Sequence, residues 1–177
     1  ANLTGALPAI SGAALTNLPA SGISMADAWL VTSSYNTNSS ADITSNWARH
    51  SAQGSWLGNI GSAMTESSGI FTFPSTGIYM VINDLSGYTP GGARSYLGMR
   101  QYFSADGGSS YNVSNSHYSN SYIGNGHFQG SGTVIYDVTS TTNNKIKFNV
   151  EVSDTSQVFG SATNKNTGAV FIRLGDT

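Results

Sequence analysis

The segment 69–82, Gly-Ile-Phe-Thr-Phe-Pro-Ser-Thr-Gly-Ile-Tyr-Met-Val-Ile, restricts the possible folds of this chain more than any other segment. Two short apolar runs flank a Pro-Ser-Thr-Gly break. Phe71 and Phe73 lie two positions apart and share one face of a strand. Pro74 cannot donate to a sheet, and Gly77 tolerates the positive φ of a tight corner. The segment therefore predicts a strand, a turn and a second strand.

Short runs of the same kind recur along the chain, and no convincing amphipathic helix interrupts them. The runs that predict strands are 29–32, 70–73, 78–82, 94–103, 133–138, 145–152 and 169–174. The pattern 105–108, Ala-Asp-Gly-Gly, predicts a tight hairpin turn. Runs 133–138 and 145–152 are predicted to form a second hairpin, and the Gly- and Ser-rich tract 109–132 to be rich in loops. Together these features predict an all-β, two-sheet antiparallel sandwich.

Apolar and polar residues alternate almost without exception in the run 145–152. This pattern is typical of a strand in a sheet with one face buried and one face exposed to solvent. The residues predicted to point inward are Ile146, Phe148, Val150 and Val152. Those predicted to face water are Lys145, Lys147, Asn149 and Glu151.

Composition argues against several partners. Ser, Thr, Asn and Gly fill 82 of the 177 positions, whereas charged residues make up only 9% and the net charge is −2. Without a cluster of Lys and Arg, the chain lacks the electrostatic footprint of a nucleic-acid binder. No apolar run approaches the roughly 20 residues that a membrane-spanning helix needs, so we expect no membrane insertion. Cysteine is absent, which excludes disulfides and thiolate chemistry.

The first 22 residues differ from the rest. They carry no charged side chain, and Leu3-Thr-Gly-Ala-Leu-Pro-Ala9 is echoed by Leu15-Thr-Asn-Leu-Pro-Ala20. Pro8 and Pro19 exclude a long regular helix. Residues 1–22 are therefore interpreted as a stalk segment packed about a symmetry axis or, alternatively, as a flexible leader. Residues 23–177 would form the globular domain.

Two segments resemble a known family. Gly69 to Tyr79 resembles the "G-x-F-x-x-P-x-x-G-x-Y" segment of the tumour-necrosis-factor-like (TNF-like) jelly rolls, which include the globular heads of the complement first component. Thr167 to Ile172 resembles their closing strand. The sequence from Ile60 to Gly77 is similar to that of globular head domains in proteins of marine bacteriophages. The Leu-Pro-Ala repeat resembles the shaft sequences that precede such heads in phage fibres.

The resemblance implies a homotrimer in which each protomer is a ten-strand jelly roll with both termini near the stalk-side base. It also implies that aromatic and aliphatic residues of segment 69–82 serve as core and protomer-contact residues. Those residues are Phe71, Phe73, Tyr79 and Val81.

No catalytic signature is present, so we expect no enzyme activity and no cofactor. His50, His117 and His127 are separated by 67 and 10 positions, which matches no zinc spacing. Serines lack the surroundings of a nucleophile elbow, and glycine-rich pieces lack the Lys-Ser/Thr of a phosphate loop. Calcium is a weaker possibility, through loop carboxylates near predicted strand ends. The candidates are Asp84, Asp106, Asp137 and Asp154.

The tract 109–132 is the best candidate for recognition, because aromatic rings interleave there with Ser, Asn and Gly, as in many binding surfaces. The alternative is that several of these rings pack between protomers or beneath the loop. The candidate receptor-binding residues are Tyr111, His117, Tyr118, Tyr122, His127 and Phe128.

These features favour a non-enzymatic virion structural protein, the trimeric head of a bacteriophage fibre or appendage that attaches to a glycan or protein of the host surface. Its other partners would be virion proteins. Two alternatives remain open: a phage capsid-decorating protein, and a secreted bacterial adhesin or carbohydrate-binding module.

Overall fold

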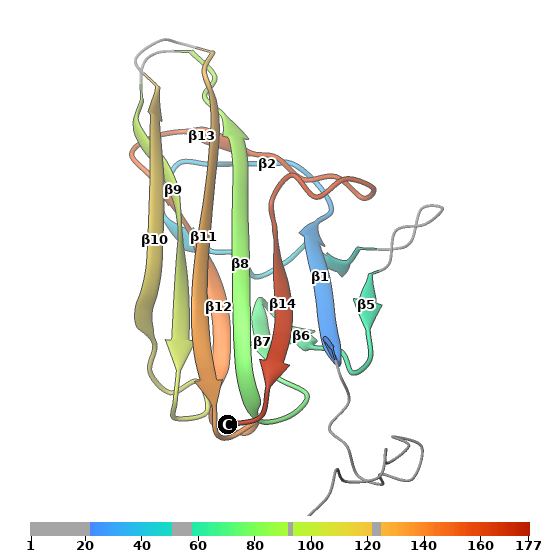
Figure 1. Ribbon diagram of the computed structural model, residues 1–177. Helices are drawn as coiled ribbons and strands as arrows, with labels where there is room; N and C mark the ends of the chain where they lie inside the picture. The colour runs from blue at the N-terminus through green and yellow to red at the C-terminus, as the bar shows by residue number, and fades with distance from the viewer. Residues whose placement is uncertain (1–21, 51–57, 92–93, 122–124) are drawn as a thin grey trace, which may run out of the picture.

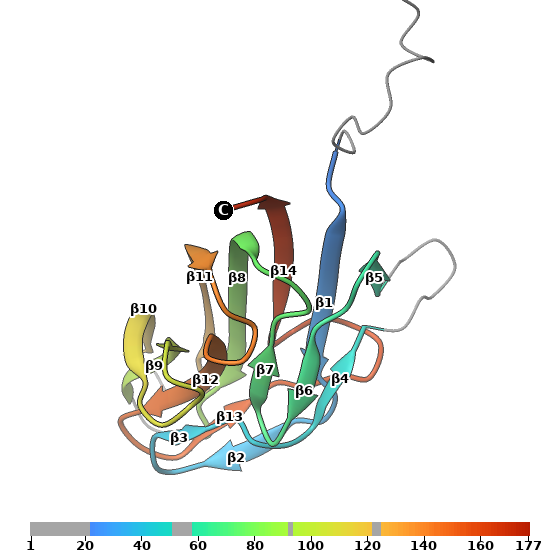
Figure 2. The same cartoon turned by 90° about the horizontal axis from the view of Figure 1, so that it is seen from below.

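A computed structural model of the chain places two antiparallel sheets face to face (Figures 1 and 2). The structure describes residues 22–50, 58–91, 94–121 and 125–177. Within these ranges every regular element is a strand, and no helix could cross a membrane. The two-sheet jelly-roll prediction is confirmed. The described strands number fourteen rather than ten, because several are short pieces of two or three residues.

Sheet A has eight strands, in the order β2-β13-β8-β14-β1-β4, with β11 also paired to β8 and β5 to β1. Its bounds are β2 (Tyr35–Thr37), β13 (Ser156–Val158), β8 (Gly77–Tyr88), β14 (Gly168–Gly175), β1 (Met25–Val31), β4 (Trp47–Arg49), β11 (His127–Val138) and β5 (Asn59–Ile60).

Sheet B has six strands, in the order β10-β9-β12-β7-β6, with β3 also paired to β12. Its bounds are β10 (Asn112–Ser121), β9 (Arg94–Ser104), β12 (Lys145–Val152), β7 (Ile70–Thr72), β6 (Thr65–Ser67) and β3 (Ala41–Asp42).

Aromatic rings fill the centre of the space between the sheets. Phe71 of β7 lies edge-on to Trp29 and Trp47, with ring centroids 5.3 and 5.1 Å apart. The same ring contacts Phe148 at 5.7 Å and Phe171 at 5.2 Å. Because these rings come from five strands and both sheets, this cluster ties the whole sandwich together.

The segment 69–82 forms strand, turn and strand as predicted, but its two strands lie in different sheets. Phe71 is in sheet B and Tyr79 in sheet A, so the turn carries the chain across the core. A Cβ on Gly77, where φ is 140°, would lie 2.5 Å from the carbonyl oxygen of Gly175. Only glycine fits this crossing without strain.

The predicted core residues of this segment are confirmed, but their predicted contact with neighbouring protomers is wrong. Phe71, Phe73, Tyr79 and Val81 are at most 2% exposed within a single chain. They are covered by their own chain, so no surface remains for a partner.

The second predicted hairpin is wrong. The strand β11, which contains 133–138, pairs with β8 in sheet A, whereas β12 pairs with β9 and β7 in sheet B. Alternation identifies the buried face of a strand but not its neighbour, and the connection 139–144 crosses between sheets. The inward residues predicted for β12 are buried. Among the outward ones Glu151 is also largely buried, because it pairs with Arg100.

The tract 109–132 was predicted to be rich in loops, and this is also wrong. Most of it forms β10 and the first half of β11, each paired along its length with a neighbouring strand. The turn between β9 and β10 is confirmed: Gly107 and Gly108 have φ of 77° and 93°. These polar segments form regular strands because they pair with strands far away in the sequence. The local sequence pattern does not indicate such pairing.

Strand β1 begins where β14 ends, since Met25 pairs with Arg173, and we call this end of the sandwich the base (Figure 1). The C-terminus lies at the base too. At the opposite end, the tip, β8 and β10 end and β9 and β11 begin. The predicted stalk lies outside the described residues except for Gly22, and it stays a prediction.

Candidate recognition surfaces

The outward face of sheet A carries a continuous row of apolar side chains near the base. The strand register places Ile135, Met80, Ile172, Ala26 and Ile60 side by side across five strands. Ile135 is 62% exposed and Ile60 is 45% exposed. We call these five residues the apolar row. Apolar side chains that lie next to one another on an exposed sheet face are typical of an interface.

Towards the tip the same face becomes polar. Asp84 and Lys165 form an ion pair there, beside Gln129 and Ser131 of β11. These side chains line a hollow of about 410 Å³. The outward face of sheet A is thus divided into an apolar half at the base and a polar half towards the tip.

The outward face of sheet B carries a different arrangement, centred on Tyr118 of β10. Tyr118 pairs with Gly98 of β9, and Gly98 pairs on its other side with Glu151 of β12. A Cβ on Gly98 would lie 2.2 Å from Cδ1 of Tyr118, so the absent side chain makes room for the ring. Tyr118 is 45% exposed and meets Tyr96 edge-on, with ring centroids 5.6 Å apart.

Arg100 connects these groups. Its Nε donates to the hydroxyl oxygen of Tyr118 at 2.8 Å, and its Nη1 lies 3.1 Å from Oε1 of Glu151. Hydrogen bonds with Tyr102 and Tyr118 raise the pKa of the Arg100 guanidinium above its ordinary value, which keeps it charged. We call Tyr96, Arg100, Tyr118 and Glu151 the Tyr118 surface.

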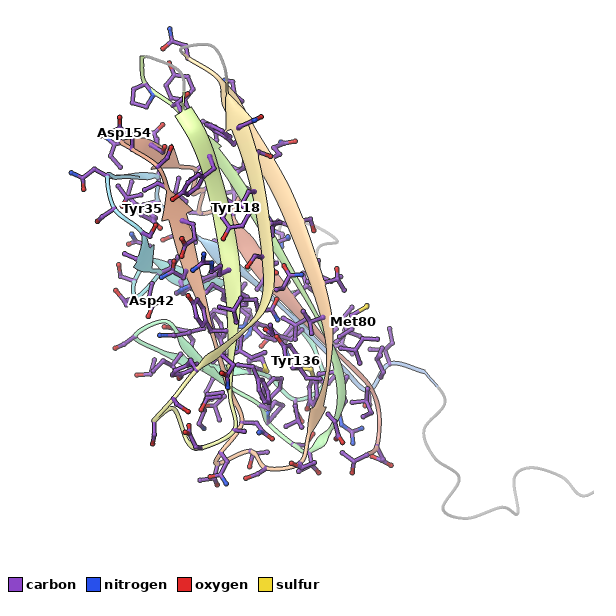
Figure 3. The ribbon with its side chains drawn as sticks, turned by 90° about the vertical axis from the view of Figure 1, so that its left-hand side faces the viewer. Tyr35, Asp42, Met80, Tyr118, Tyr136 and Asp154 are labelled. Carbon is purple, nitrogen blue, oxygen red and sulfur yellow. The ribbon has the colours of Figure 1, made fainter. Side chains whose placement is uncertain are left out.

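Two hollows adjoin the Tyr118 surface. One of about 410 Å³ is lined by Tyr96, Arg100, Tyr118 and Glu151. The other, of about 400 Å³, is lined by Tyr96, Tyr118, Ser119 and Asn120. The tyrosine pair is common to both. Figure 3 shows Tyr118 over the middle of the facing strands, while Met80 of the apolar row projects at the far edge of the molecule.

The structure separates the predicted recognition residues. Only Tyr118 lies at the Tyr118 surface. Tyr111 lies towards the base of sheet B, where the Nζ of Lys147 sits 4.4 Å from its ring centroid. His127 is exposed and lies on sheet A with Tyr88 and Phe159, at ring distances of 5.3 and 5.6 Å.

Two further predicted residues change role, and one is not described. Phe128 is 1% exposed, so its prediction as a receptor contact is wrong: its ring belongs to the core. His117 points from β10 towards β11. Its Nε2 lies 2.8 Å from Nδ2 of Asn83, a residue of β8, the strand that pairs with β11. A Cβ on Gly130 of β11 would lie 2.3 Å from Nδ1 of His117, so the ring fills the seam between the strands. Tyr122 lies outside the described residues.

Sequence reasoning missed Tyr96, Arg100 and Glu151. They come from β9 and β12, and only the pairing of those strands brings them to Tyr118. The available signal was a glycine within a predicted strand, Gly98, whose same-face neighbours two positions away are Tyr96 and Arg100. A glycine inside a strand is typical of a close approach by another group.

Two of the four calcium candidates, Asp84 and Asp106, have protein partners that occupy their carboxylates. Asp84 pairs with Lys165, and Asp106 accepts hydrogen bonds from Ser104 and Ser110 in its own turn. Those bonds lower the pKa of Asp106 to about 2. In the part of the chain that the structure describes, no three acidic or histidine side chains gather as a metal site.

The fold is that of the TNF-like jelly rolls. The chain is similar to Eiger TNF from S. frugiperda, with a TM-score of 0.63 and 10% identity over 86% of this chain and 93% of that one. It is also similar to murine APRIL at pH 5.0, with a TM-score of 0.58 and 12% identity over 85% of this chain and 99% of that one. At these identities the likeness concerns the fold alone. No protein-family model and no curated protein sequence matches the chain.

Proposed function

We propose that this chain is the trimeric head of a non-enzymatic bacteriophage virion protein, and that it attaches the particle to the host cell surface. The observation that carries the proposal is the apolar row on the outward face of sheet A. Ile135, Met80 and Ile172 expose aliphatic surface next to one another, in a chain in which Ser, Thr, Asn and Gly fill 82 of 177 positions.

Two further copies of the same chain are the occupants that fit this face. The row runs across the sheet near the base, where the described chain begins and ends. Three copies around an axis through the base would place their N-terminal segments together, as a shared stalk requires. Closed symmetry of this kind buries apolar faces without leaving an open surface for further growth. The TNF-like resemblance, which implies a homotrimer, agrees with this arrangement.

The role in attachment is supported by the opposite face. The Tyr118 surface lies on sheet B, so it stays accessible when sheet A is covered. The phage origin and virion location are supported by the sequence alone, through the likeness of Ile60 to Gly77 to marine phage heads and of the N-terminal repeat to fibre shafts.

The trimer is tested by light scattering of the purified chain during size-exclusion chromatography. We expect a mass three times the 18.5 kDa of one chain. A stable monomer at micromolar concentration would contradict the proposed trimer.

The location is tested with antibodies raised against the purified domain and applied to phage particles that carry this chain. Gold label at appendage ends, together with antibody inhibition of adsorption, is the expected result. Label spread over the capsid surface would instead identify a capsid-decorating protein.

A further inference from the structure

We propose that the hollows beside Tyr118 bind an uncharged saccharide of at least two sugar units, and that this is the host component the head recognises. The inference rests on the proposed attachment function and names the class of ligand. It begins from the two tyrosines, whose rings are held in place rather than loosely exposed.

Tyr118 is positioned by three contacts. Gly98 leaves the space that its ring fills, Tyr96 packs edge-on against it, and Arg100 donates to its hydroxyl oxygen. A ring fixed this way loses little side-chain entropy when a ligand stacks on it. The carbon–hydrogen face of a pyranose is flat and apolar and stacks well on such a ring.

The charges at the site indicate an uncharged ligand. Arg100 and Glu151 pair with each other, so the first hollow has no net charge. A carboxylate or ammonium on the ligand would have to compete with this pair. A hydroxyl group has no such conflict, because it can donate to the carboxylate and accept from the guanidinium. The guanidinium carries five N–H donors, more than its contacts with Tyr102, Tyr118 and Glu151 use.

The second hollow supplies the same chemistry without charge. Ser119 and Asn120 line it with hydroxyl and amide groups, which both donate and accept hydrogen bonds. The two hollows, of about 400 and 410 Å³, are open to solvent, so a ligand there would lie along the surface with one face exposed. Because the two hollows share the tyrosine pair, a chain of two sugars can place one unit on each side of the rings.

The hydrogen-bonding groups beside the two tyrosine rings separate this site from a protein-docking surface. The hot spots of protein interfaces are aromatic or arginine anchors sealed from water at the centre of a larger contact area. The Tyr118 surface is open, small and rich in hydrogen-bonding groups. A saccharide matches all three properties.

The test uses the purified full chain and a fixed set of probes. The neutral disaccharides are lactose, maltose and cellobiose, and the charged sugars are glucuronic acid and glucosamine. Saturation-transfer NMR detects binding, and calorimetric titration measures affinity. We expect at least one disaccharide to bind with a millimolar dissociation constant and more tightly than either charged sugar.

Variants assign the binding to the site. Tyr118→Ala should weaken binding at least tenfold, whereas Tyr118→Phe, which keeps the ring and loses the bond from Arg100, should lose less. Tyr88→Ala is the matched control, because Tyr88 is a half-exposed tyrosine on sheet A, and it should leave binding unchanged. Circular dichroism of each variant confirms that the fold is intact.

Several outcomes would overturn the inference. They are no disaccharide binding at tens of millimolar, tighter binding of a charged sugar, an unaffected Tyr118→Ala variant, or loss of binding in Tyr88→Ala. If the trimer adsorbs to host cells and no disaccharide binds, the receptor is a protein and the attachment function stands. If the chain is a monomer that binds the disaccharide, the proposed function fails and the saccharide site stands.

Discussion

The outward faces of the two sheets are built from strands of similar length and yet differ in chemistry. Sheet A presents the apolar row, whose members carry no polar group beyond the backbone. Sheet B presents tyrosines, Lys147, Arg100 and Glu151, which bond to one another across strands. Both faces belong to sheets whose inner sides are equally apolar. The difference therefore does not come from folding, because either face could have been polar without cost to the core.

The comparison indicates how the chain divides two tasks. An aliphatic face gains free energy only when it is covered, at roughly 25 cal/mol per Å² removed from water. A face of mutually bonded polar groups gains little from being covered, but it offers directed hydrogen bonds to a small ligand. Under the proposed function, sheet A would serve self-association and sheet B recognition.

The largest expected effect tests the first assignment. Met80→Asp places a carboxylate in the middle of the apolar row. In a trimer that covers this face the charge would lose its water and gain no partner, a cost of several kcal/mol. We expect the trimer to dissociate to monomers in light scattering, with the monomer still folded by circular dichroism.

Ile70→Asp is the matched control for this change. Ile70 is 36% exposed and lies on β7 of sheet B, so an aspartate there should leave the trimer intact. If Ile70→Asp dissociates the trimer and Met80→Asp does not, the roles of the two faces are reversed.

The next largest effect concerns the packing of sheet B. Gly98→Ala puts a methyl group 2.2 Å from Cδ1 of Tyr118 and 2.5 Å from the carbonyl oxygen of His117. The ring can move but the carbonyl cannot move easily, so we expect about 1–3 kcal/mol of destabilisation. Tyrosine fluorescence should also change as the ring is displaced. The free energy of unfolding is measured by denaturant titration, and a stabilised variant would contradict this geometry.

Gly91→Ala provides the control for the loss of a glycine as such. A Cβ at Gly91 meets no atom within 4 Å, but φ there is 66°, so any cost is one of backbone strain alone. Its tyrosine fluorescence should match that of the unmodified chain, unlike that of Gly98→Ala.

The sequence predicted the two-sheet sandwich because the inner faces obey simple rules. Alternation placed Ile146 and Phe148 in the core, and Pro74 and Gly77 marked a corner. The partners of the strands were less accessible. β8 was expected to end at Ile82, yet it continues through polar residues to Tyr88, because pairing with β11 satisfies the backbone there. Pairing between strands that are distant in sequence cannot be predicted from the local pattern of apolar and polar residues.

The same reason limited the prediction of the recognition surface. Tyr118 stood out as an aromatic residue among serines and asparagines. Arg100 and Glu151 did not, because each looked like an ordinary outward residue of its own strand. They become a site only through the register that sets both beside Gly98 and Tyr118. Phe128 was misassigned because its neighbours resemble a loop although its side chain faces the core.

A smaller effect concerns the ion pair of sheet B. The Arg100 side chain is 36% exposed and that of Glu151 is 12% exposed, so solvent reaches this pair from the arginine side. Pairs open to solvent typically contribute about 0.2–1 kcal/mol. A double-mutant cycle with Arg100→Met and Glu151→Gln should give a coupling energy in that range and decline with added salt. A coupling energy near zero would mean that Tyr102 and Tyr118, rather than Glu151, orient the guanidinium.

The smallest effect concerns His117, which lies in the seam where β10 of sheet B meets β11 of sheet A. Burial lowers the pKa of His117 because the charged ring loses water, and the nearby Asp84 opposes this only in part. Asp84 is itself paired with Lys165. Nδ2 of Asn83 lies 2.8 Å from Nε2 of the ring, and a neutral ring can accept a hydrogen bond from that amide.

The sign of the pH dependence follows from that lowered pKa. Below an ordinary histidine pKa of about 6.5, the unfolded chain binds a proton that the folded chain does not. The free energy of unfolding should therefore fall as pH drops from 7.5 to 5.5. His117→Gln should show a smaller fall than the unmodified chain, and His127→Gln, which alters an exposed histidine on sheet A, should not. Equal falls in all three proteins would show that the acid-sensitive group is not His117.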